Sequence, residues 1–343
     1  MNNKTIIAMS GGVDSSVAAF LMKESGAVLK GVTLNLTDMA ESEADDAKKI
    51  AQSLGFFHTT LDLRAEFEKE VIDRFISAYE RCTTPNPCIY CNQHIKFGYL
   101  LDYAKKEGYD SVATGHYVRA ERSGDRYILK KGTDPQKDQS YVLYCLTQEQ
   151  LSKSRFPLGA LTKDEVRQIA NSEGFVNAKK RESQDICFVP DGDYAAFIER
   201  KLNKSYKPGE FVDFNGNVLG THKGLIRYTI GQRKGLGLSL PKPMYVCSLC
   251  PERNSVILGD NDDLFSKTLD VCDINLIATD KIDSCIDAEV KIRYSQRAQK
   301  ARIWQTAPDR LHIEFNEPQR AITSGQSAVL YDGDTVIGGG IIM

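Results

Sequence analysis

A short turn rich in glycine and serine, at residues 10–16, constrains the fold of this chain more than any other feature. It follows the apolar run 5–9, which predicts a strand, and it opens onto the helical pattern of residues 17–22. Gly11 and Gly12 can adopt any φ and let an anion approach closely, while backbone N–H groups and the positive end of the helix face that anion. The sequence therefore predicts a phosphate-binding turn between a strand and a helix.

The order of residues in this turn differs from two common phosphate-binding motifs. The patterns Gly-x-x-x-x-Gly-Lys-Ser/Thr and Gly-x-Gly-x-x-Gly are both absent from it. The heptad SGGVDSS instead resembles the PP-loop of the N-type ATP pyrophosphatases, enzymes that adenylate a substrate and release pyrophosphate. An ordinary strand-to-helix turn would explain the glycines and serines but not the whole heptad. The resemblance implies ATP with Mg²⁺ as the ligand.

The length of the chain, 343 residues, exceeds the usual size of one hydrophobic core and predicts two or three domains. To about Gly115, strand-like runs alternate with amphipathic helical segments, as in a parallel α/β sheet. A hairpin is expected over residues 118–131, and helices from Gln139 to about Gly174. Helical periodicity ends near residues 207–209, and short alternating strands follow.

We therefore expect an α/β fold in three parts. An N-terminal PP-loop domain with a parallel sheet, of the adenine nucleotide alpha hydrolase-like type, would span residues 1–206. A small β-rich central domain would span 207–265, and a C-terminal β-barrel 266–343. Ligands of open parallel sheets bind at the carboxyl ends of the strands, where Ser10 and Gly115 would both lie.

Composition excludes several classes of protein. Lys and Arg number 44 against 46 acidic residues, and a net charge of −2 gives no global signal for nucleic acid, so any RNA contact must come from local patches. No apolar run approaches the roughly 18 residues that span a bilayer, and no signal peptide precedes the first strand, so we expect a cytoplasmic protein without a membrane partner. Nine cysteines are too sparse for a disulfide scaffold.

Two segments carry cysteines in unusual surroundings. Residues 84–92 read TPNPCIYCN and lie between two helical patterns. Because two prolines exclude a helix there, we predict that a shaped loop holds these cysteines. The spacing Cys88-x-x-Cys91 suits redox or metal chemistry. Residues 183–188 read SQDICF and contain Cys187.

Six motifs in order carry a second and more specific resemblance. They are SGGVDSS at 10–16, TPNPCIYCN at 84–92, ATGHY at 113–117, KDQSYVL at 137–143, SQDICF at 183–188 and YTIGQRKGLG at 228–237. Together they resemble the tRNA-specific 2-thiouridylase (MnmA) family and cover most of the chain. The resemblance implies that sulfur replaces the C2 oxygen of the wobble uridine after adenylation by ATP, in tRNAs for Lys, Glu and Gln.

The resemblance also implies roles for individual residues. Cys187 would carry sulfur as a persulfide, and Cys91 would be the nucleophile that attacks it, leaving a Cys91–Cys187 disulfide for a thiol reductant to reset. The sulfur donor would be a cysteine desulfurase or a sulfur-relay protein. The implied nucleotide-binding residues are Ala8, Met9, Ser10, Gly11, Gly12, Val13, Asp14, Ser15, Leu34 (a methionine in many relatives) and Gly115.

Cys88 departs from the family pattern, because relatives usually carry an aspartate at its position that is proposed as a base. The departure leaves the base open. Cys88, Cys91 and Cys187 would also suit an iron–sulfur cluster with one iron left open for sulfide, which is a minor alternative. A blander interpretation makes Cys88 a small buried residue.

Two basic segments without acidic residues predict RNA contact. Residues 221–235 contain Lys223, Arg227, Arg233 and Lys234, and residues 291–302 contain Lys291, Arg293, Arg297, Lys300 and Arg302. Tyr228 and Tyr294 lie within them and could stack on unpaired bases. The target uridine would be flipped out of its stack to reach the cysteines. The tRNA-contacting residues that the family implies are Asn86, Pro87, Cys88, Lys137, Asp138, Gln139, Arg293 and Tyr294.

Other residues and functions compete with these interpretations. Cys247 and Cys250 would point to opposite faces of a strand, which argues against a shared zinc ion. His116 would lie beside the nucleotide. Two rival functions stay open: another PP-loop enzyme, such as an amidating ligase or a different tRNA thiolase, and an inactive RNA-binding protein that retains the fold.

Overall fold

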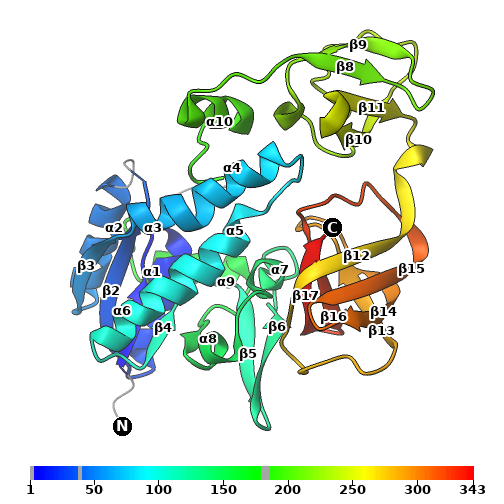
Figure 1. The fold of residues 1–343 in the computed structure, drawn as a ribbon. Coiled ribbons are helices and arrows are strands. Elements are labelled where there is room, and N and C mark those ends of the chain that lie inside the picture. Colours follow the sequence, from blue (N-terminus) through cyan, green and yellow to red (C-terminus); the bar gives the residue numbers. More distant parts are fainter. Residues whose placement is uncertain (1–3, 38–40, 179–185) are drawn as a thin grey trace.

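The computed structural model describes residues 4–37, 41–178 and 186–343, and its strands form three sheets. Figure 1 shows an N-terminal part from blue to green, a small yellow-green part, and an orange-to-red C-terminal part. Within the described residues the sheets contain five, four and eight strands. The predicted fold class, an α/β domain followed by a small β-rich domain and a β-barrel, is confirmed.

The N-terminal sheet is parallel and has the strand order β3-β2-β1-β4-β7. Its strands are β1 (Lys4–Ala8), β2 (Val28–Asn35), β3 (Phe57–Asp62), β4 (Ser111–Ala113) and β7 (Ser154–Arg155). Because β2 and β3 lie on one side of β1 while β4 and β7 lie on the other, the strand order reverses at β1. Ligands bind at such a switch point, beyond the carboxyl ends of the strands. The residues that follow β1 and β4 share this edge.

Helices cover both faces of this sheet (Figure 1). Successive residues of β1 point to opposite faces, so Ile7 packs with α1 (Val13–Glu24), α2 (Glu41–Ser53) and α9 (Lys163–Ser172). Ile6 packs on the other face with α6 (Leu100–Lys106). Both isoleucines are completely buried, so the strand that leads into the glycine turn is held by two apolar layers.

The cysteine segment is helical from Pro87 onward, which corrects the loop predicted for residues 84–92. Asn86 caps the helix by accepting the N–H of Cys88, and Pro87 is the first helical residue. Proline is tolerated at that position because its missing N–H would have no partner inside the helix. The chain continues through helical elements without a break, which places Cys88 and Cys91 on a rigid support. These elements are α5 (Pro87–Tyr90), the π-helix η2 (Cys91–Tyr99) and α6.

The helices that precede this segment form one continuous rod over residues 64–80. It comprises α3 (Arg64–Phe67), the π-helix η1 (Glu68–Ile72) and α4 (Asp73–Glu80). Its apolar face joins α10 (Tyr194–Leu202) in one core, where the rings of Phe75 and Phe188 meet edge to face at 5.2 Å. Phe188 directly follows Cys187, so this core fixes the backbone next to that thiol.

The predicted hairpin exists as β5 (Val118–Ser123) and β6 (Arg126–Lys131), but it belongs to the C-terminal sheet, in which β6 pairs with β17 (Thr335–Ile342). The helices expected from Gln139 to Gly174 are shorter than the pattern suggests. They are α7 (Ser140–Leu143), α8 (Gln148–Ser152) and α9, and the edge strand β7 interrupts them. A two-residue strand is set by pairing with β4, which periodicity along the chain does not reveal.

The central part is a four-stranded sheet of order β10-β11-β8-β9. Its strands are β8 (Gly209–Val212), β9 (Val218–His222), β10 (Tyr245–Cys250) and β11 (Ser255–Gly259), with the short helices η3 (Leu225–Arg227), η4 (Pro251–Arg253) and η5 (Asp262–Leu264). The register between β10 and β11 shifts at Cys247, which is a bulge. Cys247 and Cys250 are both free and half-buried.

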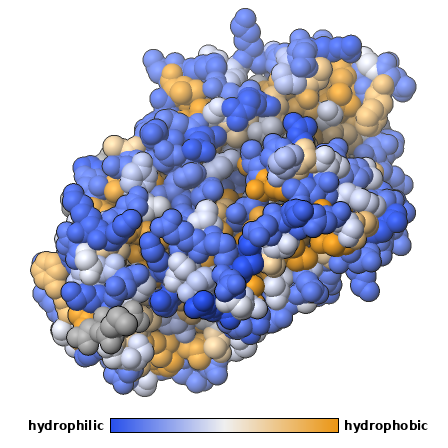
Figure 2. Space-filling model, turned by 60° about the horizontal axis from the view of Figure 1, so that its bottom comes forward, coloured by the Kyte–Doolittle hydropathy of each residue, from blue (hydrophilic) through white to orange (hydrophobic). Residues whose placement is uncertain are grey.

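The C-terminal sheet closes into a six-stranded barrel, because β12 pairs with both β15 and β17. The barrel strands are β12 (Phe265–Leu276), β13 (Ile286–Lys291), β14 (Gln299–Ala307), β15 (Arg310–Arg320), β16 (Ser327–Asp332) and β17. The face of the molecule in Figure 2 is mainly hydrophilic with scattered hydrophobic patches. Within the described part of the chain, the helices are too short or too polar to cross a membrane.

Candidate active site

The turn after β1 is shaped by its own side chains. Gly11 has φ 67°, a left-handed conformation that favours glycine, and Gly12 is extended and immediately precedes α1. The carbonyl of Gly12 accepts the hydroxyls of Ser15 at 3.0 Å and Ser16 at 2.9 Å. The N–H of Ser10 donates to the Ser15 hydroxyl at 3.2 Å. These bonds hold the turn in front of the positive end of α1, as an anion site requires.

Asp14, in the first turn of α1, is bound by two residues from later segments. Lys163 Nζ lies 2.6 Å from Asp14 Oδ1, and the Tyr117 hydroxyl donates to the same oxygen at 2.7 Å. The Lys163 side chain is 8% exposed and that of Asp14 31%. Thr162 and Glu165 form a capping box that fixes the start of α9, where Lys163 is the first residue. No sequence motif predicts these roles of Lys163 and Tyr117.

Asn177 is a second residue that the sequence did not reveal. Its side-chain amide donates to the Gly11 carbonyl at 2.9 Å and to the Ser16 hydroxyl at 3.0 Å. Asn177 is buried, and its own side-chain oxygen has no hydrogen-bond partner among the described residues. A lone asparagine in a polar segment carries no sequence signal, so only the packing of this segment on the turn identifies it.

The remaining nucleotide-site candidates line the same edge of the sheet. A Cβ atom at Gly115 would lie 2.9 Å from the Asp14 carbonyl carbon, so only glycine allows the residues after β4 to pack against the start of α1. Ala8 ends β1, and the Met9 carbonyl accepts the Thr33 hydroxyl at 2.7 Å. Leu34, near the end of β2, is half-buried. These positions lie beside the turn, at or near the carboxyl ends of β1, β2 and β4.

His116 is buried beneath this edge and is hydrogen-bonded to Thr114 at 2.7 Å. Burial lowers its pKa well below the usual value, and the nearby Lys96 lowers it further. The imidazole is therefore neutral at pH 7. A neutral histidine with this bond orders the residues between β4 and Tyr117.

The three cysteines of interest differ in their exposure. Cys88 and Cys187 are exposed, whereas Cys91 is buried, and all three are free thiols. Residues 183–185 of the SQDICF motif lie outside the described part of the chain. Cys88 and Cys91 are three residues apart on a helix, so they lie on the same face. The exposure of Cys88 excludes the interpretation that it is a small buried residue.

The thiols are close enough to affect one another electrostatically. Burial raises the pKa of Cys91 to about 11, Lys96 lowers it, and the neighbouring Cys187 and Cys88 thiols raise it. Partial burial also raises the pKa of Cys187, to which Cys88 adds and which Lys96 opposes. Lys96 lies five residues after Cys91 on the π-helix, whose wide turn keeps these two residues on neighbouring sides. Lys96 is therefore the cation of this cysteine cluster.

Within the described residues, no three His, Cys, Asp or Glu side chains are grouped closely enough to hold a metal ion. The arrangement of Cys88, Cys91 and Cys187 thus does not fit a preformed iron–sulfur site. Mg²⁺ makes a weaker demand, because it is usually bound through one or two carboxylates and the phosphates of the nucleotide. Asp14 is the carboxylate placed to meet it.

Two of the residues predicted to touch tRNA have structural partners. Asp138 accepts the N–H groups of Gly132 and Ser140, and the side-chain oxygen of Gln139 accepts the N–H of Tyr117 at 3.0 Å. Both residues therefore order the segment between the hairpin and α7. Lys137, beside them, is half-buried.

The basic segment at residues 291–302 contains a cation between two aromatic rings. Lys291 Nζ lies 5.6 Å from the ring centre of Tyr141 and 5.3 Å from that of Tyr294. Tyr294 is 43% exposed. Burial lowers the pKa of Lys291, while Asp138 raises it and Lys131 lowers it. An exposed ring beside a lysine suits a base and its phosphate.

Other members of the basic segments serve the fold instead. Tyr228 is 5% exposed and packs against Phe211 and His222, so the expectation that it stacks on RNA is wrong. Tyr228 follows a 3-10 turn, which sends its ring inward. Arg227 is ion-paired with Glu199. The exposed cations of the segments are Lys223, Arg233, Lys234, Arg297, Lys300 and Arg302.

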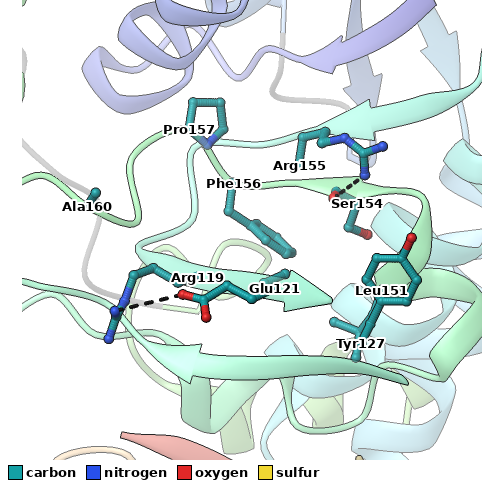
Figure 3. Close-up of a pocket in the computed structure, with 10 residues that line it drawn as sticks. Arg119, Glu121, Tyr127, Leu151, Ser154, Arg155, Phe156, Pro157 and Ala160 are labelled. Atoms are coloured by element: carbon teal, nitrogen blue, oxygen red, sulfur yellow. Dashed lines mark hydrogen bonds and ion pairs between the residues drawn. The ribbon is translucent and has the colours of Figure 1, made fainter. Parts of the chain in front are cut away.

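A cavity of about 400 Å³ lies outside this site. Figure 3 shows Phe156 projecting between β7 and the β5–β6 hairpin, with Arg119 paired to Glu121. Arg155 donates to the carbonyls of Ser152 and Ser154. The cavity contains none of the predicted site residues, and its arginines are engaged by the protein itself. It is not the nucleotide site.

Comparison with known proteins decides the family. The description "tRNA methyl transferase HUP domain" matches residues 3–191, "tRNA methyl transferase PRC-barrel domain" 195–260, and "Aminomethyltransferase beta-barrel domain" 266–342. The tRNA-specific 2-thiouridylase MnmA 1 of Caldanaerobacter subterraneus subsp. tengcongensis is 50% identical over 100% of this chain and 98% of its own length. This chain belongs to the MnmA family.

Other relatives agree. The tRNA-specific 2-thiouridylase MnmA of Clostridioides difficile is 48% identical, again over 100% of this chain and 98% of that protein. Among solved structures, the U34-tRNA thiolase NcsA from Methanococcus maripaludis with its [4Fe-4S] cluster is 20% identical over 59% of this chain and 68% of its own, with a TM-score of 0.37. That likeness is too distant to bear on the chemistry of the MnmA family.

Proposed function

We propose that this protein catalyses the ATP-dependent 2-thiolation of the wobble uridine of tRNAs of the Lys, Glu and Gln type. One observation supports this most strongly: within the PP-loop domain an exposed thiol, Cys187, and a buried thiol, Cys91, lie close enough to affect each other electrostatically. The proposed sulfur transfer uses two thiols, whereas methyl transfer, which two of the matched domain descriptions mention, needs neither. The names of the curated relatives point the same way.

Adenylation is the first step of the proposed reaction. The C2 oxygen of uridine attacks the α-phosphorus of ATP, the bond to the β-phosphate oxygen breaks, and pyrophosphate leaves with the electron pair. The turn at residues 10–16 and the start of α1 would hold the phosphates. Mg²⁺ would neutralise part of their charge, with Asp14 as its protein contact. The Lys163 ammonium, at 2.6 Å, compensates the Asp14 carboxylate before ATP arrives.

Sulfur transfer is the second step. A donor protein loads Cys187 as a persulfide, and the Cys91 thiolate attacks Sγ of Cys187. The bond between Sγ and the outer sulfur breaks, the outer sulfur leaves as hydrosulfide, and a Cys91–Cys187 disulfide forms. Hydrosulfide adds to C2, and AMP departs with the C2 oxygen. A thiol reductant then supplies two electrons that restore both thiols.

Formation of the Cys91 thiolate is the electrostatic difficulty of this step. Burial raises the pKa of Cys91 to about 11, so the thiol form dominates at pH 7. Cys88 stands where relatives have a carboxylate, so it offers no carboxylate base. The cation that favours the thiolate is Lys96, one π-helical turn away. Among the described residues the three cysteines are not grouped as a metal site, so the proposed reaction is written through thiols alone.

The tRNA would lie across the barrel and the cysteine helix. Tyr294 and Lys291 offer an exposed ring and a cation, and Asn86, Pro87 and Cys88 begin the helix that carries Cys91. Its target base would leave the stack to reach a buried thiol. We propose the division 1–206, 207–265 and 266–343 for the three domains, with the cytoplasm as the site of the reaction.

Reconstitution tests the function. The full chain, ATP with Mg²⁺, an unmodified tRNA transcript, a sulfur-loaded cysteine desulfurase and a thiol reductant should yield 2-thiouridine, detected by nucleoside mass spectrometry, and one pyrophosphate per uridine. Pyrophosphate release without thiolation, unaffected when Cys91 and Cys187 are both changed to serine, would favour another PP-loop enzyme. An RNA-binding protein without activity would release no pyrophosphate.

A further inference from the structure

A set of hydrogen bonds joins all three domains just before the cysteine helix. The N–H of Thr84 donates to the Ser324 carbonyl of the barrel at 2.8 Å, and Gln326 Nε2 donates to the Thr84 carbonyl at 2.7 Å. The Thr84 hydroxyl lies 3.4 Å from that of Thr229 in the central domain. Both backbone groups of one residue are thus held by the barrel. We call Thr84, Thr229 and residues 324–326 the Thr84 seam.

The turn that holds Thr84 requires a glycine. Gly325 has φ 88°, and a Cβ atom there would lie 2.9 Å from the Thr84 nitrogen and 3.0 Å from the Thr83 Cβ. The turn is itself part of the barrel wall, because the Gly325 N–H donates to the Ile342 carbonyl and the Ile342 N–H to the Gln326 carbonyl. Thr84 is therefore fixed relative to β17, not merely in contact with a mobile surface.

Arg293 ties the central domain to the same place. Its Nη2 donates to the Ile230 carbonyl at 3.3 Å, to the Ala321 carbonyl at 2.8 Å and to the Thr323 hydroxyl at 2.6 Å. The YTIGQRKGLG motif, for which the proposed reaction has no use, thus supplies the central-domain side of this contact. Because the Arg293 guanidinium donates to three protein oxygens, its first role is to stabilise this domain contact rather than to bind RNA.

Only two residues separate Thr84 from the helix that carries the thiols. Pro85 has its φ fixed by its ring, and Asn86 caps α5 by accepting the N–H of Cys88 at 3.1 Å. Pro87 then starts the helix. Such a short and stiff link passes any displacement of Thr84 on to Cys88 and Cys91.

We propose that Thr84 and Gln326 are positioning residues for sulfur transfer: the barrel sets where the cysteine helix lies. This inference rests on the proposed thiolation. It assigns the barrel a second task besides holding RNA, and it explains why the barrel contacts the catalytic domain directly before its thiols. A misplacement of about 1 Å can lower a rate about a hundredfold.

The Gln326→Ala variant tests the proposal. We expect the turnover number for thiolation to fall about 10- to 100-fold, while the dissociation constants for tRNA and ATP stay within about twofold. Alkylation of the exposed Cys88, followed by peptide mass spectrometry, should change in rate, whereas alkylation of the distant exposed Cys285 should not. A purely structural role of Gln326 would alter neither the turnover number of the folded protein nor the ratio of the Cys88 alkylation rate to the Cys285 alkylation rate.

Gln305→Ala is the matched control. Gln305 is also a half-buried glutamine of the barrel, and its Nε2 donates to the Pro308 carbonyl at 3.2 Å within the barrel. Equal losses in both variants, or a Gln326→Ala loss accounted for by tRNA affinity alone, would overturn the proposal. If wild-type protein fails to thiolate, the proposed function fails instead.

A second pair of variants does not depend on the glutamine. The methyl group that Gly325→Ala adds would clash with Thr84. The methyl group of Gly333→Ala, at φ 59° in the turn between β16 and β17, would have no atom within 4 Å. Both carry the backbone strain of a positive φ, but only the first should lower turnover about tenfold or more at unchanged tRNA affinity. Equal turnover in the two variants would contradict the proposal.

Discussion

The ATP side and the sulfur side of the site are built to different degrees. Around the glycine turn, Lys163, Tyr117 and Asn177 already bond to the turn or to Asp14. At the thiols, burial holds Cys91 in its protonated form while Cys187 lies exposed. The nucleotide half is thus organised without its ligand. In the proposed reaction, a protonated Cys91 would leave a persulfide on Cys187 intact until tRNA is bound.

The largest expected effect separates these two halves. Cys91→Ser and Cys187→Ser should each lower thiolation about a thousandfold or more, since each removes a reacting sulfur. Pyrophosphate release that depends on tRNA should persist within a fewfold. Nucleoside mass spectrometry and a pyrophosphate assay measure the two. Cys285→Ser, which removes another exposed thiol, serves as the control. Residual thiolation by either active-site variant would contradict the separation of the nucleotide half from the sulfur half.

Between pH 7 and pH 9, the rate of sulfur transfer should change about a hundredfold more than the rate of pyrophosphate release. Because the pKa of Cys91 is raised to about 11, its thiolate fraction grows about tenfold per pH unit below that value. Single-turnover sulfur transfer should therefore rise about a hundredfold from pH 7 to 9, and pyrophosphate release should not follow it.

Lys96→Met sharpens this test. Lys96 lowers the pKa of Cys91, so its removal should raise that pKa and shift the transfer profile to higher pH. The exposed Lys105, on α6, provides the control variant Lys105→Met with an unchanged profile. A flat profile in wild-type protein would mean that thiolate formation at Cys91 does not limit transfer.

On the ATP side, Lys163→Met should weaken ATP binding about 10- to 30-fold. The change leaves the Asp14 carboxylate without its ammonium next to the phosphates, and it should lower the free energy of unfolding by about 2 kcal/mol, since Asp14 is partly screened by solvent. Calorimetry and urea unfolding measure these effects. Lys30→Met removes a comparable lysine, paired with Glu107, and should cost stability without affecting ATP. Equal ATP affinity in both variants would contradict this.

The smallest expected effect concerns RNA. Tyr294→Ala should weaken tRNA binding about fivefold through the loss of one stacking ring. Tyr228→Phe should leave tRNA affinity unchanged, because that ring is buried. A filter-binding titration at fixed salt compares them. The opposite order would mean that RNA contacts the central domain rather than the barrel.

The glycine turn and the cysteine segments could be located from the sequence because each is a contiguous motif. The glycine turn and the two cysteine segments need particular residues at particular spacings, and the strand rhythm places the turn at the carboxyl edge of the sheet. Lys163 and Asn177 escaped prediction because they approach the turn from positions about 150 residues away. No local pattern encodes such a contact.

The wrong predictions share a different cause. The two prolines of the cysteine segment predict that no helix forms there, yet Pro87 occupies the first helical residue, where proline is tolerated. The basic neighbours of Tyr228 predict an RNA contact, but its ring packs in the core of the central domain. In both cases the outcome depends on one residue's place relative to an element boundary, which is the least predictable property of a sequence.

The hairpin of β5 and β6 has a practical consequence for exchanging parts between relatives. It lies within the stretch of chain assigned to the catalytic domain, yet it extends the sheet of the barrel through β17. A chimaera joined at residue 266 would pair a hairpin from one parent with a barrel from another. The hybrid would have to keep the pairing of β6 with β17, in which Thr335 lies opposite Lys130, about 200 residues earlier in the chain. Transplanting residues 118–131 together with the barrel should give the better-folded hybrid.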